Sequence, residues 1–226
     1  MKIVIKTLGC KSNRYESDVL FERLSGAHEV FEMNEGVTTF QRRAQADFDI
    51  AVVNTCTVTH VADRKSRQAI RSLKSANPSC RVVVFGCGSN VAREDYEAID
   101  EVDMIAGNVD EVVDFVRDVG DESEYDELKY NEAVDCGVRT RGVVKIQDGC
   151  NNYCTYCIIP RARGPEVSFD REQILEEVRR KEEAGFREIV LTGIIISNWE
   201  REDMDFVDLV EYLIEDTEFV RFRISS

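Results

Sequence analysis

The sequence predicts an α/β protein with parallel sheets, divided into two domains. Two observations predict this class. Short apolar runs alternate with longer segments in which apolar residues recur at helical spacing, a pattern typical of β–α–β chains. Between two such regions, residues 120–140 lose all periodicity and are strongly acidic. We therefore expect a first domain at residues 1–119, an acidic linker at 120–140 and a second domain at 141–226.

The first domain is expected to alternate strands and helices throughout. Strands are predicted at residues 2–8, 29–33, 48–53, 81–85 and 104–106. Helices are predicted at residues 13–24, 59–76, 93–99 and 109–119. Asn77-Pro78 ends the second helix, because proline cannot continue it. This order predicts a Rossmann-like domain with one parallel sheet.

The second domain is expected to be part of a barrel. Strands are predicted at residues 141–147, 187–191 and 219–224, with helices at 170–184 and 206–214. Strand–helix–strand–helix–strand is half of a (β/α) barrel or less, and its last strand would leave an open parallel edge. We therefore expect an incomplete barrel, in a chain that is a truncated or split form of a longer protein.

Composition limits the compartment and the kind of partner. No apolar run approaches the ~20 residues that span a bilayer, so we expect a cytoplasmic protein without a membrane partner. The net charge is −15, and residues 94–135 hold 17 acidic residues against two basic ones. Any contact with RNA must then come from local basic patches. Eight cysteines in such a chain indicate metal binding or catalysis rather than disulfides.

Three cysteines each follow a predicted strand: Cys10, Cys56 and Cys87. Because the carboxyl ends of parallel strands meet at one edge of a sheet, these residues should gather on one rim. Each lies beside Gly or Asn-Thr, which favours a ligand in a loop over an ordinary buried cysteine, the alternative interpretation. Cys80 and Cys136 lack this context, and we give them no role.

Three further cysteines form the loop C-x₃-C-x₂-C: Cys150, Cys154 and Cys157. Three thiolates can hold three irons of a four-iron cluster and leave the fourth iron without a protein ligand. An iron of this kind can bind a small organic cofactor and supply radical chemistry.

Taken together, the two cysteine sets resemble those of the radical S-adenosylmethionine (SAM) methylthiotransferases. The matching stretches are Leu8-Gly9-Cys10-Lys11-Ser12-Asn13, Asn54-Thr55-Cys56, Gly86-Cys87, Asp148-Gly149-Cys150, Cys157-Ile158-Ile159-Pro160 and Glu188-Ile189-Val190-Leu191-Thr192-Gly193. The resemblance implies two [4Fe–4S] clusters and SAM, with one cluster generating a radical and the other delivering a methylated sulfur. Lys11 and Asn13, with Tyr15-Glu16, resemble the branch that modifies C2 of N6-threonylcarbamoyladenosine beside the tRNA anticodon.

The same resemblance implies further site residues and partners. Tyr156, Thr192 and Gly193 are expected at the SAM site. Arg161 and Arg163 are expected at RNA phosphate or SAM, and the alternative is that they belong to a solvated loop. The expected partners are the tRNA anticodon loop, a sulfur donor and a reductant protein such as flavodoxin or ferredoxin. A single-stranded loop suits this chemistry, because its bases can be splayed out and reached.

Several interpretations remain open at this point. Asn13 and Asn54 either orient the first cluster or cap local turns. The basic residues of the segment Arg64–Lys74 either contact tRNA or form a solvent-facing helix surface. For the chain as a whole, the alternatives are methylthiolation of a ribosomal-protein aspartate, or a two-cluster iron–sulfur protein that transfers electrons or acts as a sensor without turning over SAM.

Overall fold

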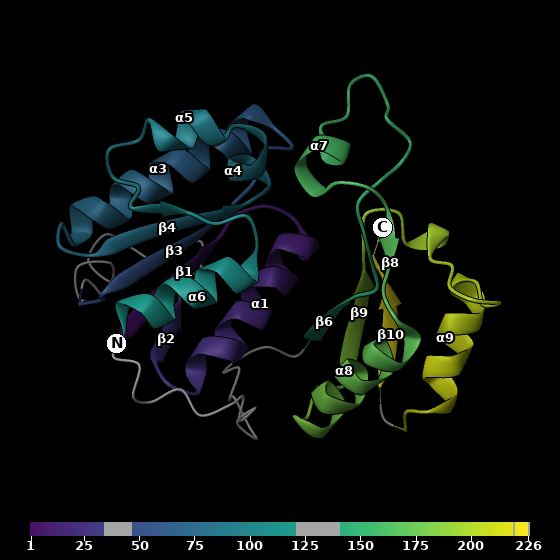
Figure 1. Cartoon of the computed structure of the whole chain (residues 1–226). Coiled ribbons are helices and arrows are strands. Elements are labelled where there is room, and N and C mark those ends of the chain that lie inside the picture. Colours follow the sequence, from purple (N-terminus) through teal and green to yellow (C-terminus); the bar gives the residue numbers. More distant parts are fainter. Residues whose placement is uncertain (34–46, 121–140, 219, 226) are drawn as a thin grey trace. The chain divides into compact units, whose positions relative to one another are not determined.

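The computed structural model describes residues 1–33, 47–120, 141–218 and 220–225 (Figure 1). The chain forms two compact units, Met1–Asn131 and Glu132–Ser226, and each is described by itself. Apart from Gly120, the predicted linker lies outside the described residues, as does Cys136. No helix in the described ranges is long and apolar enough to cross a membrane.

The first unit is built on one five-stranded sheet of order β2-β1-β3-β4-β5. Its strands are β1 (Lys2–Thr7), β2 (Glu29–Glu32), β3 (Ile50–Thr55), β4 (Arg81–Gly86) and β5 (Met104–Ile105). Every neighbouring pair is parallel, which confirms the expected parallel sheet. Thr7 pairs with Asn54, and Thr55 with Gly86, so β1, β3 and β4 end at the same level.

Helices cover both faces of this sheet, as Figure 1 shows. They are α1 (Lys11–Ser25), α3 (His60–Ala76), α4 (Cys87–Val91), α5 (Arg93–Glu97) and α6 (Val109–Val119). Along β3, Val53 packs into a core with Ile70 of α3, whereas Val52 faces Leu20 of α1 on the opposite side. This alternation follows from the two-residue period of a strand, and it gives a three-layer Rossmann-like unit.

The second unit has a three-stranded parallel sheet of order β10-β9-β6. Its strands are β6 (Arg141–Lys145), β9 (Glu188–Thr192) and β10 (Arg221–Ile224). In the chain, α8 (Arg171–Glu183) precedes β9, and α9 (Phe206–Glu215) connects β9 to β10. Asp170 and Asp205 cap the two helices through hydrogen bonds to backbone amides. Val144, Leu191 and Trp199 lie in the core beneath these helices. The sequential strand order is that of a partial (β/α) barrel.

Five short elements were not predicted. They are α4, α7 (Ile159–Arg163), the 3-10 helix η2 (Ile196–Asn198), and β7 (Gln147–Asp148), which pairs antiparallel with β8 (Val167–Ser168). The single strand expected at 141–147 is therefore divided at Ile146. Its amide donates to the carbonyl of Thr192 at 2.9 Å, and its carbonyl accepts from Phe169 at 2.9 Å. The two-stranded β7–β8 ribbon closes the base of the C-x₃-C-x₂-C loop.

Candidate functional site

The cysteines at the ends of strands lie at one rim of the first sheet. Cys10 caps α1 just after β1, Cys56 follows β3, and Cys87 is the first residue of α4 after β4. Because β1, β3 and β4 are neighbours and end level, the topology brings the three residues to the same edge. Cys10 is exposed, whereas Cys56 and Cys87 are buried. Cys87 was expected in a loop and instead begins a short helix.

Two glycines allow the neighbouring turns to approach the end of β3. Gly9 has φ +112°, and a Cβ added to it would stand 2.8 Å from Cβ and 3.0 Å from Sγ of Cys56. Gly86 has φ +101°, and its added Cβ would overlap Oδ1 of Asn54. Only glycine adopts this backbone region without strain and leaves the necessary space. The turns before Cys10 and Cys87 thus both pack directly against β3.

A buried amide pair joins the Cys10 turn to the Cys56 turn. Nδ2 of Asn13 donates to Oδ1 of Asn54 at 2.8 Å and to the carbonyl of Thr55 at 2.9 Å. Nδ2 of Asn54 donates to the carbonyl of Asn13 at 2.8 Å and to Oγ of Ser17 at 3.1 Å. The Cys10 thiol donates to Oδ1 of Asn13 at 3.3 Å. These contacts show a positioning role for both asparagines that is broader than capping a local turn.

Hydroxyl groups hold the other two cysteine turns. Oγ of Ser66 on α3 accepts from the amide of Cys56 at 3.2 Å. Oγ1 of Thr55 donates to the carbonyl of Phe85 at 2.8 Å and accepts from the amide of Ser89 at 3.1 Å. Ser66, Thr55 and Ser89 are fully buried, so these bonds are shielded from water. They fix the backbone on either side of Cys56 and Cys87.

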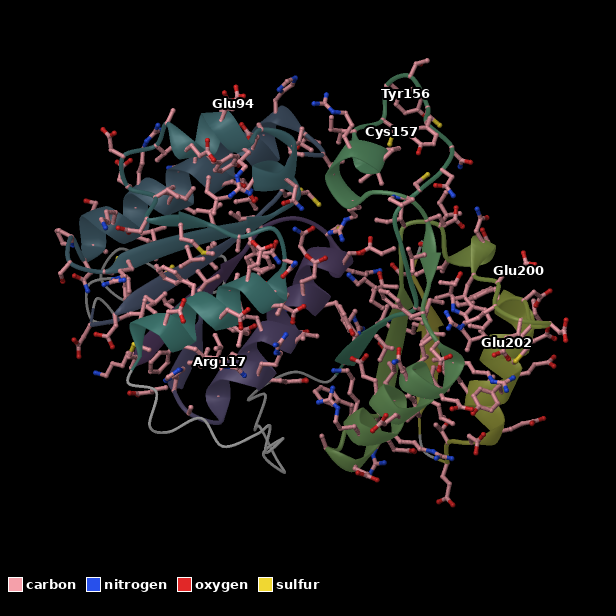
Figure 2. All side chains as sticks on the ribbon, in the orientation of Figure 1. Glu94, Arg117, Tyr156, Cys157, Glu200 and Glu202 are labelled. Carbon is pink, nitrogen blue, oxygen red and sulfur yellow. The ribbon has the colours of Figure 1, made fainter. Side chains whose placement is uncertain are left out.

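In the second unit, the C-x₃-C-x₂-C loop runs from β7 to α7. Cys150 is buried at its start, and its Sγ accepts from the amide of Asn152 at 3.4 Å. Cys157 is half-buried and Cys154 is exposed. Figure 2 shows Tyr156 and Cys157 on this loop, with Tyr156 directed outward. Tyr156 is 91% exposed, so it does not pack against Thr192 or Gly193, the other residues predicted at the SAM site.

The base of this loop is closed by backbone contacts. The amide of Cys150 donates to the carbonyl of Gly164 at 3.2 Å. Gly149 has φ +72°, and a Cβ added to it would overlap the carbonyl oxygen of Pro165 and stand 2.5 Å from its carbonyl carbon. The two ends of the loop therefore meet at a position that accepts only glycine.

A buried ion network supports the same base. Nζ of Lys145 lies 2.7 Å from Oδ2 of Asp148, and the Arg163 guanidinium lies 3.1 and 3.2 Å from the two carboxylate oxygens. Burial would raise the pKa of Asp148, but Lys145 and Arg163 favour its charged form. The amide of Gly149 adds a hydrogen bond at 2.9 Å. The net result is a pKa of Asp148 below its ordinary value.

This network corrects one expectation. Arg163 was predicted at RNA phosphate or SAM, yet its side chain is only 4% exposed and its guanidinium binds Asp148. A buried arginine in an ion pair of this kind serves the loop itself, so we no longer assign it to RNA. Arg161, two residues earlier on α7, is exposed, which is compatible with its predicted contact.

Gln147 connects the cysteine loop to the loop that follows β9. Its Nε2 donates to the carbonyls of Asp148 and Gly149 at 3.0 and 2.9 Å. Its Oε1 accepts from the amides of Ile194 and Ile195 at 2.8 and 2.9 Å. Thr192 and Gly193, the predicted cofactor residues, therefore lie against the start of the cysteine loop. A Cβ on Gly193 would stand 2.8 Å from the Gln147 carbonyl oxygen.

Sequence reasoning missed Gln147, Ser66 and the role of Asp148. Gln147 and Thr55 do carry a signal, since each is a polar residue near the end of a strand and just before a candidate cysteine ligand. Such a residue is buried only where its hydrogen bonds are satisfied, which makes it a candidate for holding a site. Ser66 lies among charged residues on a helix, and its sequence context carries no such signal.

Asp148 leads to a testable prediction on pH. A carboxyl whose pKa is lowered on folding adds stability above its ordinary pKa of 3.8, and this is lost as the pH falls through the lowered value. At neutral pH we expect Asp148→Asn to lose about 2 kcal/mol, below the range for fully buried pairs because 20% of the Asp148 side chain is exposed. The difference in the free energy of unfolding between this variant and the unmodified protein should shrink as the pH falls through the lowered pKa of Asp148.

Trp199 makes this prediction measurable. It is the only tryptophan of the chain and is buried in the second unit, so its fluorescence reports on that unit during urea unfolding. A difference between Asp148→Asn and the unmodified protein that stays constant from about pH 6 to about pH 3 would contradict a charged role for Asp148.

The donor chemistry of both sites fits iron–sulfur clusters. Each offers three cysteines on glycine-bearing turns, and thiolates are the ligands that such clusters prefer. Across residues 1–33, 47–120, 141–218 and 220–225, no three His, Cys, Asp or Glu side chains are grouped to hold a single metal ion.

Comparisons with known proteins agree with this division of the chain. Residues 144–226 match the model of the radical SAM superfamily. Residues 2–107 match the model of a family described as uncharacterized protein family UPF0004. A radical SAM methyltransferase of Kitasatospora setae, solved with cobalamin and a [4Fe–4S] cluster, has a TM-score of 0.52 at 12% identity, covering 95% of this chain and 50% of its own. At that identity, the likeness shows the fold alone.

Relatives in sequence cover both units. The chain is 35% identical to a threonylcarbamoyladenosine tRNA methylthiotransferase of Bacillus subtilis, over 99% of this chain and 51% of the relative. It is 34% identical to the protein of the same name from Aquifex aeolicus, over 98% and 55%. A tRNA-2-methylthio-N(6)-dimethylallyladenosine synthase of Endomicrobium trichonymphae is 29% identical, over 98% and 52%. The chain spans about half the length of these relatives.

The second unit is thus a radical SAM module, and the cysteine-bearing first unit accompanies it in all three of these relatives. Over nearly its whole length, the chain is similar to methylthiotransferases that modify tRNA.

Proposed function

We propose that this chain carries the two cluster sites of a tRNA-modifying methylthiotransferase that acts at C2 of N6-threonylcarbamoyladenosine. The observation that carries the proposal is the presence of two separate three-cysteine sets, one at the rim of the first sheet and one in the loop after β7. A single cluster site would serve many radical SAM reactions, whereas the second set supplies a place for the sulfur.

Each cysteine set has its own support in the chain. In the second unit, Cys150, Cys154 and Cys157 would hold one [4Fe–4S] cluster, and Thr192-Gly193 would border the SAM bound to it. In the first unit, Cys10, Cys56 and Cys87 would hold the other. When bound, the cofactors supply radical removal of an aromatic hydrogen and transfer of a methylated sulfur. The chain's own residues orient these groups.

Orientation depends on the hydrogen bonds described above. Gln147 sets the distance between the cysteine loop and the loop after β9, so it fixes the width of the SAM site. Asn13 and Asn54 fix the first cysteine turn against the second. Reactions of this kind require reacting atoms to be held within a fraction of an ångström, and buried, satisfied polar groups provide that rigidity.

The substrate and the partners are part of the same proposal. Several relatives are named for threonylcarbamoyladenosine, which supports this base over the aspartate of a ribosomal protein. An RNA base in the anticodon loop is accessible because it is single-stranded. The reaction also requires a reductant protein such as flavodoxin or ferredoxin and a sulfur donor, and its tRNA substrate places it in the cytoplasm.

Counting iron tests the two-cluster arrangement. After anaerobic reconstitution we expect about eight irons per chain, and about four in either triple variant, Cys10→Ala/Cys56→Ala/Cys87→Ala or Cys150→Ala/Cys154→Ala/Cys157→Ala. Cys80→Ala is the matched control. Cys80 is a buried cysteine of the first core, and burial raises the pKa of its thiol, so it should not change the iron content. Equal iron in the first triple variant and the unmodified protein would contradict the first site.

Activity is tested on two substrates in parallel. With SAM and a reductant, the protein should yield a methylthiolated nucleoside from tRNA that carries threonylcarbamoyladenosine, and no methylthiolated aspartate from ribosomal protein. Release of deoxyadenosine without either product would point to another radical SAM reaction. Two full clusters with no deoxyadenosine release would support the electron-transfer or sensing alternative.

A further inference from the structure

Helix α3 carries a basic surface of the first unit that the cluster sites do not use. The helix holds five basic residues and one acidic residue in a chain of net charge −15. Its inner face is formed by Ser66, Ile70 and Leu73, which pack toward the sheet. The exposed side chains after the first residue, His60, follow helical spacing on the opposite face: Val61, Arg64, Lys65, Gln68, Arg71 and Ser75.

The basic residues of α3 fall into two groups. Arg67 binds Asp63 and Asp95 and stacks on the ring of Tyr96, while Lys74 binds Asp103 and the carbonyl of Cys80. These two cations stabilise the packing of α3 in the first unit. Arg64 and Arg71 lie on the exposed face of the helix, and neither forms an ion pair with a carboxylate in the described ranges. Seven residues apart, they are about 10 Å from one another along the helix.

This surface adjoins the proposed sulfur site. Ser66, the residue that accepts from the amide of Cys56, lies in the same turn as Arg64 and Lys65. The helix begins four residues after Cys56 and is capped by Thr59, whose Oγ1 accepts from the amide of Ala62 at 3.1 Å. The exposed cations are therefore on the outer side of the helix whose inner side supports the cysteine rim.

We propose that Arg64, Lys65 and Arg71 form a docking surface for the RNA phosphate backbone, which we call the α3 basic face. The inference rests on the proposed function, since it assumes that RNA is brought to the cysteine rim. Arginine presents a fork of donors that matches phosphate oxygens, and a glutamine between the two arginines adds a neutral donor. Such contacts position a nucleic acid without reading its sequence.

RNA is favoured over an acidic protein as the occupant. Under the proposed function, the substrate base must reach the cysteine rim that α3 supports, so the RNA backbone has to pass beside this helix. On one flank, α5 bears the exposed Glu94, labelled in Figure 2, together with Asp95 and Glu97. These carboxylates would repel the backbone and limit it to the outer side of α3.

The test compares two double variants that remove the same charge. Arg64→Gln/Arg71→Gln alters the α3 basic face. The control, Arg23→Gln/Arg117→Gln, removes two arginines of α1 and α6, on the opposite face of the sheet, from ion pairs with Asp110 and Asp114. The cluster-loaded protein is titrated into a fluorescent anticodon stem–loop RNA that carries threonylcarbamoyladenosine, at several salt concentrations. Iron content and thermal unfolding verify that each variant is folded and loaded.

We expect the first double variant to bind this RNA about tenfold more weakly, and the slope of log K against log salt to fall by about 1.4 for two lost phosphate contacts. The control pair should keep the slope of the unmodified protein. Equal slopes in both double variants would overturn the docking surface. Weaker binding of the reductant protein with unchanged RNA binding would assign the face to that partner instead.

The proposed function can fail separately. If the unmodified protein binds the RNA but yields no methylthiolated nucleoside, the activity is wrong while the α3 basic face is still tested by the salt slopes. If the unmodified protein does not bind the RNA at all, both are overturned.

Discussion

Replacing Gly149 by alanine is expected to open the base of the C-x₃-C-x₂-C loop and abolish cluster binding in the second unit. The added Cβ would overlap the carbonyl oxygen of Pro165 and lie 2.8 Å from that of Gly164. Both obstacles are backbone atoms, so no side chain can move aside. The φ of +72° adds strain of its own for any residue with a Cβ. We expect a loss of at least about 3 kcal/mol in the free energy of unfolding.

The measurement separates the two cluster sites and the two units. In a Cys10→Ala/Cys56→Ala/Cys87→Ala background, reconstituted iron reports only on the second site. Adding Gly149→Ala to this background should lower the iron content from about four per chain to below about one. Urea unfolding followed by Trp199 fluorescence gives the stability of the same unit.

Two other glycines of this unit are matched controls. Gly164 and Gly185 also have positive φ, +78° and +91°, but a Cβ on either meets no atom within 4 Å. Alanine at these positions should cost only the backbone strain, about 1–2 kcal/mol, and Gly185→Ala should retain iron. If Gly149→Ala behaves like Gly185→Ala, the close approach of the loop ends is not what holds the cysteines.

The parts of the fold that the sequence predicted are those fixed by local patterns. The helix expected at 109–119 has those bounds in the structure, because Asn108 caps it and its valines recur at helical spacing. The strand expected at 81–85 extends only one residue further, to Gly86. The placement of Cys10, Cys56 and Cys87 at the ends of neighbouring strands followed from the same reasoning, since parallel strands end on one edge.

The features that were missed are fixed by contacts between distant residues. Cys87-Gly88-Ser89 contains two poor helix formers, yet α4 forms where the Ser89 amide meets Oγ1 of Thr55. The β7–β8 ribbon pairs only Gln147 with Ser168 and Asp148 with Val167, too few residues to show a period. Gln147 bridges residues 47 and 48 positions away, which no local window can detect. Arg163 looked like a surface cation because its partner Asp148 is 15 positions earlier.

The amide pair of Asn13 and Asn54 also joins residues far apart in the sequence, and Asn54→Asp is expected to disrupt it. The change is almost isosteric, but it removes the two donors that reach the carbonyl of Asn13 and Oγ of Ser17. It also brings a carboxylate close to that carbonyl in a place with no exposed surface. We expect a loss of about 3 kcal/mol, from two unmet acceptors and a buried charge.

The pH dependence of Asn54→Asp distinguishes the charge from the geometry. Burial would raise the folded-state pKa of the new carboxyl, so its penalty is complete above that pKa and declines as the pH falls toward the unfolded value. Once protonated, the new carboxyl regains one donor, and the loss should then shrink by about half. Hydrogen exchange of β1 and β3 amides measures the effect, because the first unit contains no tryptophan.

Asn90→Asp is the control, since Asn90 is exposed and undergoes the same chemical change. It should alter stability by less than about 0.5 kcal/mol. In a Cys150→Ala/Cys154→Ala/Cys157→Ala background, Asn54→Asp should also lower the iron content, because the Cys10 turn is held to the Cys56 turn through this amide. Normal iron content together with lowered stability would show that Asn54 stabilises the fold and does not position the cluster ligands. Lost iron at a pH where stability has recovered would show that the amide itself, through its second donor, positions the ligands.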